Sequence, residues 1–241
     1  MSPKSALYCT KRWPYLWFGS QSIIKFRHRF LRCALTLGLS ISPSLSAYAT
    51  TPHIAVFGDS TIQGWTGKEV ARTPAPAALA RELGDVQVEN WGVSGEKLSE
   101  VVPKWAALLA KTDASIVVVN WGLNDALECD AALYEKNLRW LVANTPRKLI
   151  LETPNFVSGN AVMVLERRAC LTHLVQIMRS VAKEKHLMLI DVYQYSKKLI
   201  QNDATLLPDG VHPSQALYNK IGQYMAQSLR PLLKKSSAKV R

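Results

Sequence analysis

The sequence predicts an α/β protein in which a parallel sheet carries helices on both faces. Short apolar segments alternate with longer segments of helical periodicity, and strands that alternate with helices pair in parallel. The third apolar segment, Ser115–Trp121, is rich in β-branched residues, as expected at the buried centre of such a sheet. Polar, potentially reactive residues follow several predicted strands, and functional groups of α/β proteins lie at the carboxyl ends of strands.

Five short runs have the length and composition of β-strands. In chain order they are His53–Phe57, Val86–Trp91, Ser115–Trp121, Lys148–Glu152 and Leu187–Val192. No internal repeat, low-complexity segment or linker separates them, so we expect the strands to belong to one domain.

Segments with helical patterns separate these strands. In the clearest one the apolar residues recur at intervals of three and four, which places them on one face of a helix. The predicted helices are Glu69–Leu83, Leu98–Lys111, Ala131–Ala143, Arg168–Lys185 and Ser214–Leu229.

The formal net charge of +12 is concentrated at the two ends of the chain. Residues 1–49 carry seven Lys or Arg and residues 230–241 carry five, and neither end has an acidic residue. The span between them has 18 basic and 18 acidic residues. A nucleic-acid-binding protein needs a basic stripe on its folded body, so this distribution argues against a nucleic-acid partner. The tail Lys234–Arg241 is expected to be a solvated end.

The first 49 residues have the features of a secretory signal peptide. A basic stretch precedes an apolar run from Cys33 to Leu45, and Ala47-Tyr48-Ala49 supplies small residues for a peptidase. We expect cleavage after Ala49, which leaves residues 50–241 as a mature domain that is periplasmic or secreted. The apolar run of 13 residues is shorter than the roughly 20 that a spanning helix needs. A retained membrane anchor is therefore the weaker alternative, and no stable span is expected after cleavage.

Two cysteines, Cys129 and Cys170, belong to the predicted mature domain. An even pair in an exported protein is a disulfide candidate. Both follow the carboxyl ends of neighbouring predicted strands, which favours a bridge, and two buried free thiols are the alternative.

Four short segments carry residue types that suit acyl transfer. Ser60, in Gly58-Asp59-Ser60, follows the first strand, where the N–H groups and dipole of a helix start favour a nucleophile with an oxyanion intermediate. Gly95 follows the second strand and lacks a Cβ, so its N–H can approach a ligand closely. Asn124 follows the third strand, and its side chain can donate to an oxyanion.

The fourth segment, Asp209-Gly210-Val211-His212, precedes the last predicted helix. His212 can act as the base that activates Ser60, and Asp209 can hold the other ring nitrogen and fix the tautomer. Taken alone, each of the four segments has a plain explanation as a helix cap, a turn or a polar loop. Together, in a workable order, they predict a catalytic site.

These segments resemble the sequence blocks of the SGNH hydrolases, the GDSL-type esterases and lipases. A Gly-Asp-Ser block, a glycine block, a Gly-x-Asn-Asp block and an Asp-x-x-His block mark that family, and all four occur here. The resemblance extends from His53 to about Leu232. It implies a three-layer α/β/α sandwich with a five-stranded, flavodoxin-like parallel sheet.

The resemblance also implies roles for individual residues. The nucleophile is Ser60, the base is His212 and its partner is Asp209. The oxyanion hole consists of the backbone N–H groups of Ser60 and Gly95 with the Asn124 side chain. No metal or organic cofactor is implied, and the histidines of the predicted domain lack the partner spacing of a metal site.

Four further residues are candidates for a substrate pocket. Trp65 has the better claim because Gly64 and Gly67 flank it in a loop. Core packing is the alternative for Trp121. Asn155 and Phe156 follow the fourth strand and are expected on the same edge of the sheet as the reactive segments.

The sequence leaves the substrate open between two classes of ester. The first hypothesis is an acyl-chain esterase, lysophospholipase or thioesterase that acts on small-molecule or lipid substrates. The alternative is a carbohydrate O-acetylesterase that acts on cell-wall or exported polysaccharide, for which nearby tryptophans are suited. A remote third hypothesis is a membrane-tethered, non-catalytic binding protein, and the intact set of candidate catalytic residues argues against it.

Overall fold

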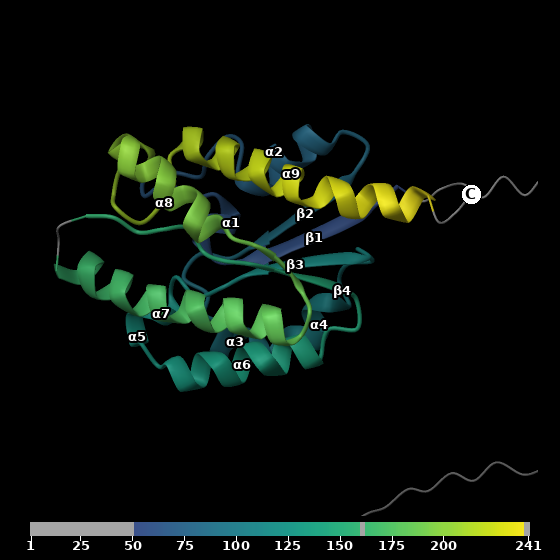
Figure 1. Cartoon of the computed structure of the whole chain (residues 1–241), viewed down its shortest axis with the longest axis horizontal. Coiled ribbons are helices and arrows are strands. Elements are labelled where there is room, and N and C mark those ends of the chain that lie inside the picture. Colours follow the sequence, from purple (N-terminus) through teal and green to yellow (C-terminus); the bar gives the residue numbers. More distant parts are fainter. Residues whose placement is uncertain (1–50, 160–161, 239–241) are drawn as a thin grey trace, which may run out of the picture. The chain divides into compact units, whose positions relative to one another are not determined.

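A five-stranded parallel sheet with the strand order β2-β1-β3-β4-β5 forms the centre of the fold (Figure 1). This confirms the predicted fold class and the flavodoxin-like order. The computed structural model describes residues 51–159 and 162–238, so the predicted signal peptide lies outside the described residues. The strands are β1 (His53–Gly58), β2 (Gln87–Gly92), β3 (Ile116–Asn120), β4 (Lys148–Glu152) and β5 (Met188–Ile190).

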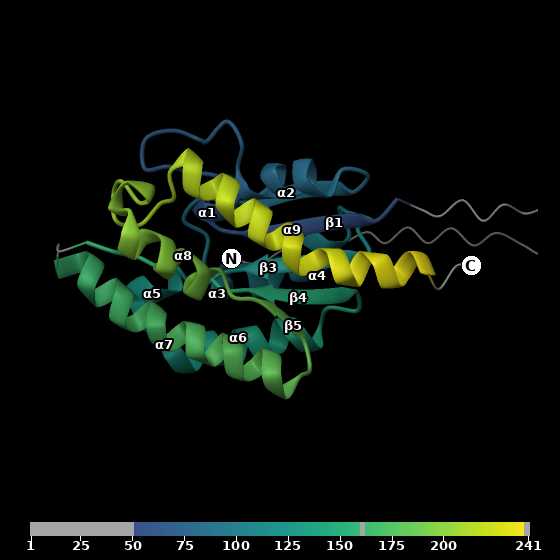
Figure 2. The same cartoon turned by 45° about the horizontal axis from the view of Figure 1, so that its top comes forward.

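Helices cover both faces of the sheet, as Figures 1 and 2 show from two directions. One face carries α2 (Ala75–Leu83), α8 (Val192–Asn202) and α9 (Gln215–Ala238). The other face carries α3 (Leu98–Val101), α4 (Trp105–Leu109), α6 (Ala131–Ala143) and α7 (Val162–Glu184). Two short helices, α1 (Ser60–Gln63) and α5 (Asp125–Glu128), follow the carboxyl ends of β1 and β3, and short 3₁₀ turns lie at Val102–Lys104 and Ala204–Leu206.

The helix predicted from Glu69 is shorter than expected. Helix α2 begins only at Ala75, next to Pro74, because proline favours the start of a helix over its interior. The preceding residues form a loop in which Trp65 and Val70 pair in an antiparallel bridge.

Other boundaries differ as well. The predicted helix Leu98–Lys111 is divided into α3 and α4 by a 3₁₀ turn that contains Pro103. Helix α9 continues to Ala238, so the described part of the predicted tail, residues 234–238, is helical. Helix α8 is not among the helices predicted from the sequence; it follows the short strand β5 with only Asp191 between them.

The buried core lies on both faces of the sheet. All five residues of β3 are buried, as predicted for a central parallel strand. No helix within residues 51–159 and 162–238 combines the length and the apolar character that a membrane crossing requires.

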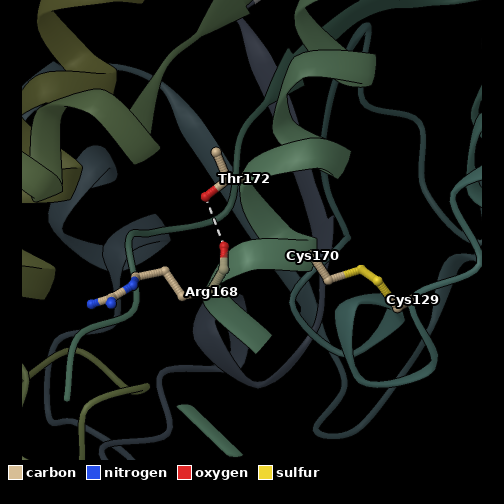
Figure 3. Close-up of a disulfide and its surroundings, with 4 residues drawn as sticks. All are labelled: Cys129, Arg168, Cys170 and Thr172. Atoms are coloured by element: carbon tan, nitrogen blue, oxygen red, sulfur yellow. Dashed lines mark hydrogen bonds between the residues drawn. A yellow bond between two sulfur atoms is a disulfide. The ribbon is translucent and has the colours of Figure 1, made fainter. Parts of the chain in front are cut away.

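A disulfide joins Cys129 and Cys170 (Figure 3). Cys129 caps the C-terminus of α5 in a left-handed backbone conformation, and Cys170 is buried in α7. The bond therefore ties the turn that follows Asn124 to the long helix α7. Arg168 points away from the bridge on another side of the same helix (Figure 3).

Replacement of both cysteines by serine is expected to lower the free energy of unfolding by about 4 kcal/mol, because a cross-link over 41 residues restricts the unfolded chain. Urea unfolding of the oxidised protein measures this change. Reductant should destabilise the wild-type protein by a similar amount and leave the double variant unaffected. Equal stability of the wild-type and variant proteins would contradict a stabilising bridge.

Candidate active site

The register of the central strands brings three distant segments to one edge of the sheet. Gly58 at the end of β1 pairs with Gly92 of β2 on one side and with Asn120 of β3 on the other. The loops after these three strands therefore begin at the same level. A cleft of about 520 Å³ lies at this edge, and among its lining residues are Ser60, Gly95, Asn124 and His212.

A row of hydrogen-bonding side chains crosses the cleft. The distance from Ser60 Oγ to His212 Nε2 is 3.2 Å, and the distance from His212 Nδ1 to Asp209 Oδ2 is 2.7 Å. When the Nδ1–H group donates to the carboxylate, Nε2 is left as an acceptor for the serine hydroxyl. The structure thus brings together the three side chains that the sequence proposes as nucleophile, base and orienting acid.

The Asp209 carboxylate also organises its own loop. Its Oδ1 atom accepts hydrogen bonds from the backbone N–H groups of Val211 at 2.9 Å and His212 at 2.6 Å. Partial burial by itself raises the pKa of Asp209, but the hydrogen bonds from His212 and Val211 outweigh it and lower the pKa below its ordinary value. The lowered pKa favours the carboxylate form of Asp209, which accepts a hydrogen bond from the imidazole.

The loop after β4 supports the histidine segment from behind. The Asn155 side chain donates to the carbonyl of Val211 at 3.0 Å, and the N–H of Ser158 donates to the carbonyl of Gly210 at 2.8 Å. From the other side Gly67, with a φ of +91°, packs so close to Asp209 that a Cβ would stand 2.4 Å from Oδ2. Both contacts restrict where the acid and the imidazole can lie.

Helix α1 positions the serine. Asp59 caps the helix by accepting from the N–H and the hydroxyl of Thr61, both at 2.9 Å. Ser60 is the first helical residue, so its backbone N–H has no acceptor within the helix. The Asn90 side chain donates to the carbonyl of Ile62 at 2.9 Å and holds the helix against β2.

The three candidate oxyanion donors come from residues of the cleft wall. They are the backbone N–H groups of Ser60 and Gly95 and the side-chain amide of Asn124, and all three residues line the cleft. Gly95 adopts a φ of +80°, which favours glycine. Asn124 donates one hydrogen bond to the carbonyl of Glu96 at 3.2 Å, which orients its amide and leaves a second N–H.

The cleft wall includes residues that the sequence analysis missed. Gln63 lies three residues after Ser60 on the same short helix, a spacing that places both on one face. Its side chain accepts a hydrogen bond from the Ser94 hydroxyl. Val70 is half exposed and pairs with Trp65 across the loop. No local pattern marks Val70, because the sequence predicts a helix at this position.

Of the four residues predicted for a substrate pocket, Trp65 lines the cleft, and Trp121, Asn155 and Phe156 do not. Trp121 is only 2% exposed and packs edge-on against Trp105 in the core. Asn155 is buried, and its side-chain amide donates a hydrogen bond to the carbonyl of Val211 in the loop that carries His212. Phe156 lines a different groove, between α7 and α8.

Three of the buried carboxyl groups among the described residues have a raised pKa. Burial raises the pKa of Asp59 to about 6, of Asp125 to about 7 and of Glu152 to about 8. Asp125 accepts from the N–H of Leu98 at 3.1 Å and so joins the start of α5 to the start of α3. Glu152 accepts from the Asn120 amide at 2.8 Å.

One group among the described residues has the composition of a metal site, namely His53, Glu89 and Asp113. It lies where β1 begins, whereas Ser60 follows the end of that strand. The two carboxylates contact different ring nitrogens, with Glu89 at 2.8 Å from Nε2 and Asp113 at 2.7 Å from Nδ1. Since a metal ion binds one ring nitrogen, this geometry fits a histidine held between two acids better than three ligands of one ion.

A serine, a histidine and an aspartate in a hydrogen-bonded row are the arrangement of the serine hydrolases. The sequence profile of the GDSL-like lipase/acylhydrolase family matches residues 56–220, and the chain belongs to this family. The protein is therefore a serine hydrolase that acts on ester bonds. None of the curated proteins compared with the chain matches it.

Several solved structures share the fold. The lipase/acylhydrolase from Enterococcus faecalis is 25% identical, with a TM-score of 0.65 over 75% of this chain and 96% of that chain. LAE5, an α/β hydrolase from the metagenome of Lake Arreo in Spain, is 24% identical, with a TM-score of 0.60 over 74% and 93%. The acetylxylan esterase Axe2 from Geobacillus stearothermophilus is 22% identical, with a TM-score of 0.59 over 74% and 93%.

The buried Glu152 predicts a pH-dependent stability. Its pKa rises from 4.5 to about 8 on folding, so the folded state holds the proton more tightly. The resulting stabilisation is complete below pH 4.5 and is lost as the pH rises to about 8. Glu152→Gln cannot ionise and should lack this contribution. Its stability should therefore fall less than that of the wild type between pH 5 and pH 9, by on the order of a few kcal/mol.

Urea unfolding of both proteins at the two pH values tests this. Glu166→Gln, on an exposed position of α7, is the matched control and should keep the wild-type pH dependence. The same pH dependence in Glu152→Gln and wild type would contradict a protonated Glu152.

Proposed function

We propose that this protein is an exported serine esterase that hydrolyses acyl esters or thioesters through Ser60, His212 and Asp209. The observation that carries the proposal is the hydrogen-bonded row from Ser60 Oγ through the imidazole to the Asp209 carboxylate, which opens onto a cleft. Export is proposed from the signal-like residues 1–49. The even cysteine pair in the domain agrees with an oxidising compartment.

The mechanism follows from the positions of the donors and acceptors. His212 Nε2 takes the proton of the Ser60 hydroxyl while Oγ attacks the carbonyl carbon of the ester, and Asp209 stabilises the imidazolium. The tetrahedral intermediate expels the alcohol or thiol, which leaves with the proton from Nε2. A water molecule then attacks the acyl-enzyme with His212 again as the base. The acid is released and Ser60 regains its proton.

The oxyanion of both tetrahedral intermediates lies within reach of the N–H groups of Ser60 and Gly95 and of the Asn124 amide. These donors follow three neighbouring strands of the sheet: Ser60 begins α1 after β1, and Gly95 and Asn124 follow β2 and β3. They are in place before the substrate arrives, so little reorganisation is needed when negative charge develops.

Exposed apolar side chains beside the nucleophile favour an acyl-chain substrate. Val70 lines the cleft and is 50% exposed. Trp65 adds an aromatic surface to the same wall. Large exposed apolar side chains in a cleft mark ligand contact, and an acyl chain gains free energy by covering them.

A carbohydrate O-acetylesterase is the second candidate, and one observation favours it. Beside the Trp65 ring the cleft carries the polar side chains of Gln63 and Ser94. An aromatic face with adjacent hydrogen-bonding groups suits a sugar, and an acetyl group needs only a short pocket.

Asn124→Ala is expected to lower kcat by roughly a hundredfold to a thousandfold, the usual effect of removing one oxyanion donor. Asp209→Asn should lower kcat by about 10⁴, because the imidazole then loses its orienting acceptor. Steady-state kinetics on a short p-nitrophenyl ester measure both effects. Asn202→Ala, an exposed asparagine at the end of α8, should match wild type. Full activity of Asn124→Ala would remove this residue from the oxyanion hole.

A chain-length profile is expected to separate the two substrate classes. Residues 50–241 are assayed on p-nitrophenyl esters from acetyl to long acyl, with Ser60→Ala as the blank. An acyl-chain esterase should prefer medium or long chains, and Val70→Asp should raise KM for those chains more than for acetate. A sharp preference for acetate, unchanged by Val70→Asp, would favour the O-acetylesterase. Activity equal to the blank at every length would contradict both.

A further inference from the structure

A second groove, of about 460 Å³, lies between helices α7 and α8. The Phe156 ring lines it, together with side chains from both helices, and it shares no lining residue with the active-site cleft. The polar lining residues are Arg168, Thr172, Gln176 and Arg179 from α7, and Gln194 and Lys197 from α8.

Two cations from different helices converge on one ring in this groove. The guanidinium carbon of Arg168 lies 6.0 Å from the centroid of Phe156, and Lys197 Nζ lies 5.7 Å from the same centroid. Within the part of the chain that the structure describes, neither cation forms an ion pair with a carboxylate. The ring compensates part of the charge, and the repulsion between the two cations remains.

The third cation of the groove is already neutralised. Arg179 donates two hydrogen bonds to Asp191, at 3.0 Å from Nε and 3.1 Å from Nη2. This bidentate pair fixes Arg179 as part of the wall. The positive charge that is available to a ligand is therefore that of Arg168 and Lys197.

The groove also has an apolar side. Leu165 is 39% exposed and lies on α7 one turn before Ala169, and both residues line the groove. A ligand that meets both sides must combine an anionic head with an apolar body. An inorganic ion would leave Leu165 uncovered, and an uncharged lipid would leave the cations unpaired.

The walls of the groove are fixed relative to one another. The hydroxyl groups of Thr172 and Tyr193 are 2.7 Å apart and connect α7 to α8. On another side of α7 the Cys129–Cys170 disulfide holds the helix segment that carries Arg168 (Figure 3). A preformed site lowers the entropic cost of binding.

We propose that this groove binds a small amphipathic anion. Its carboxylate or phosphate head pairs with Arg168 and Lys197, and its apolar body covers Leu165 and Ala169. Carboxylic acids, which ester hydrolysis releases, and phosphate monoesters share this chemistry. The inference rests on the groove alone and does not depend on the identity of the ester substrate.

Isothermal titration with hexyl phosphate, hexanoate and hexanol tests the site. Both anions, or one of them, should bind to the wild-type protein and hexanol should not, because it lacks the head group. Tighter binding of hexyl phosphate would assign the site to phosphate monoesters, and tighter binding of hexanoate to carboxylic acids. No binding of either anion at millimolar concentration would overturn the proposal.

Arg168→Gln/Lys197→Gln is expected to weaken binding roughly tenfold or more for each cation removed, since each charged hydrogen bond is lost. The matched control Lys136→Gln/Lys220→Gln removes the same charge from exposed positions on α6 and α9 and should bind as wild type. Arg168→Lys keeps the charge and should retain most of the affinity.

Binding that is equal in wild type and in Arg168→Gln/Lys197→Gln would place the ligand elsewhere, including in the catalytic cleft, and would overturn the proposal. Unchanged hydrolysis of p-nitrophenyl acetate by this variant checks that it is folded. Because the readout is binding, a failure here leaves the proposed esterase function intact. Conversely, if the wild-type protein shows no esterase activity but still binds hexyl phosphate, the proposed function fails and the proposed binding site is supported.

Discussion

The parallel hydrogen bonding of β1 to both of its neighbours is the constraint on which the site depends. Gly58 stands level with Gly92 and Asn120, so three loops that are far apart in the sequence start from one line. Gly92 also allows α1 to pack directly on β2, since a Cβ at this position would stand 2.0 Å from the nitrogen of Gln63. This register brings the segments that carry the three candidate oxyanion donors to one edge of the sheet.

The histidine segment is positioned by a different set of forces. It lies after the last strand, and its backbone carbonyls accept hydrogen bonds from the loop that follows β4. The edge of the sheet therefore determines the position of the proposed nucleophile, and contacts between two loops determine the position of the proposed base. Asp209 joins the two parts, because it holds the imidazole and packs against Gly67 of the loop that follows α1.

Buried acidic groups near the cleft order the segments around it through hydrogen bonds. Asp59 caps α1, and Asp125 joins the start of α5 to the start of α3, so each carboxyl orders a loop that carries a candidate functional residue. Burying such groups opposes folding unless they are protonated or well hydrogen-bonded. The apolar core on both faces of the sheet and the Cys129–Cys170 disulfide offset this destabilisation. Proteins commonly accept this kind of local cost at functional sites.

The sequence by itself determined the fold class, the five strands and the residues that form the row, because strand periodicity and reactive residue types are local properties. It also indicated the cysteine pair. Only the tertiary structure decided which side chains face the cleft. Trp121 and Asn155 lie close in sequence to the reactive edge, yet packing against Trp105 and a hydrogen bond to Val211 turn them inward. Conversely, Val70 lines the cleft and pairs with Trp65 in a short bridge, where the sequence pattern predicts a helix from Glu69.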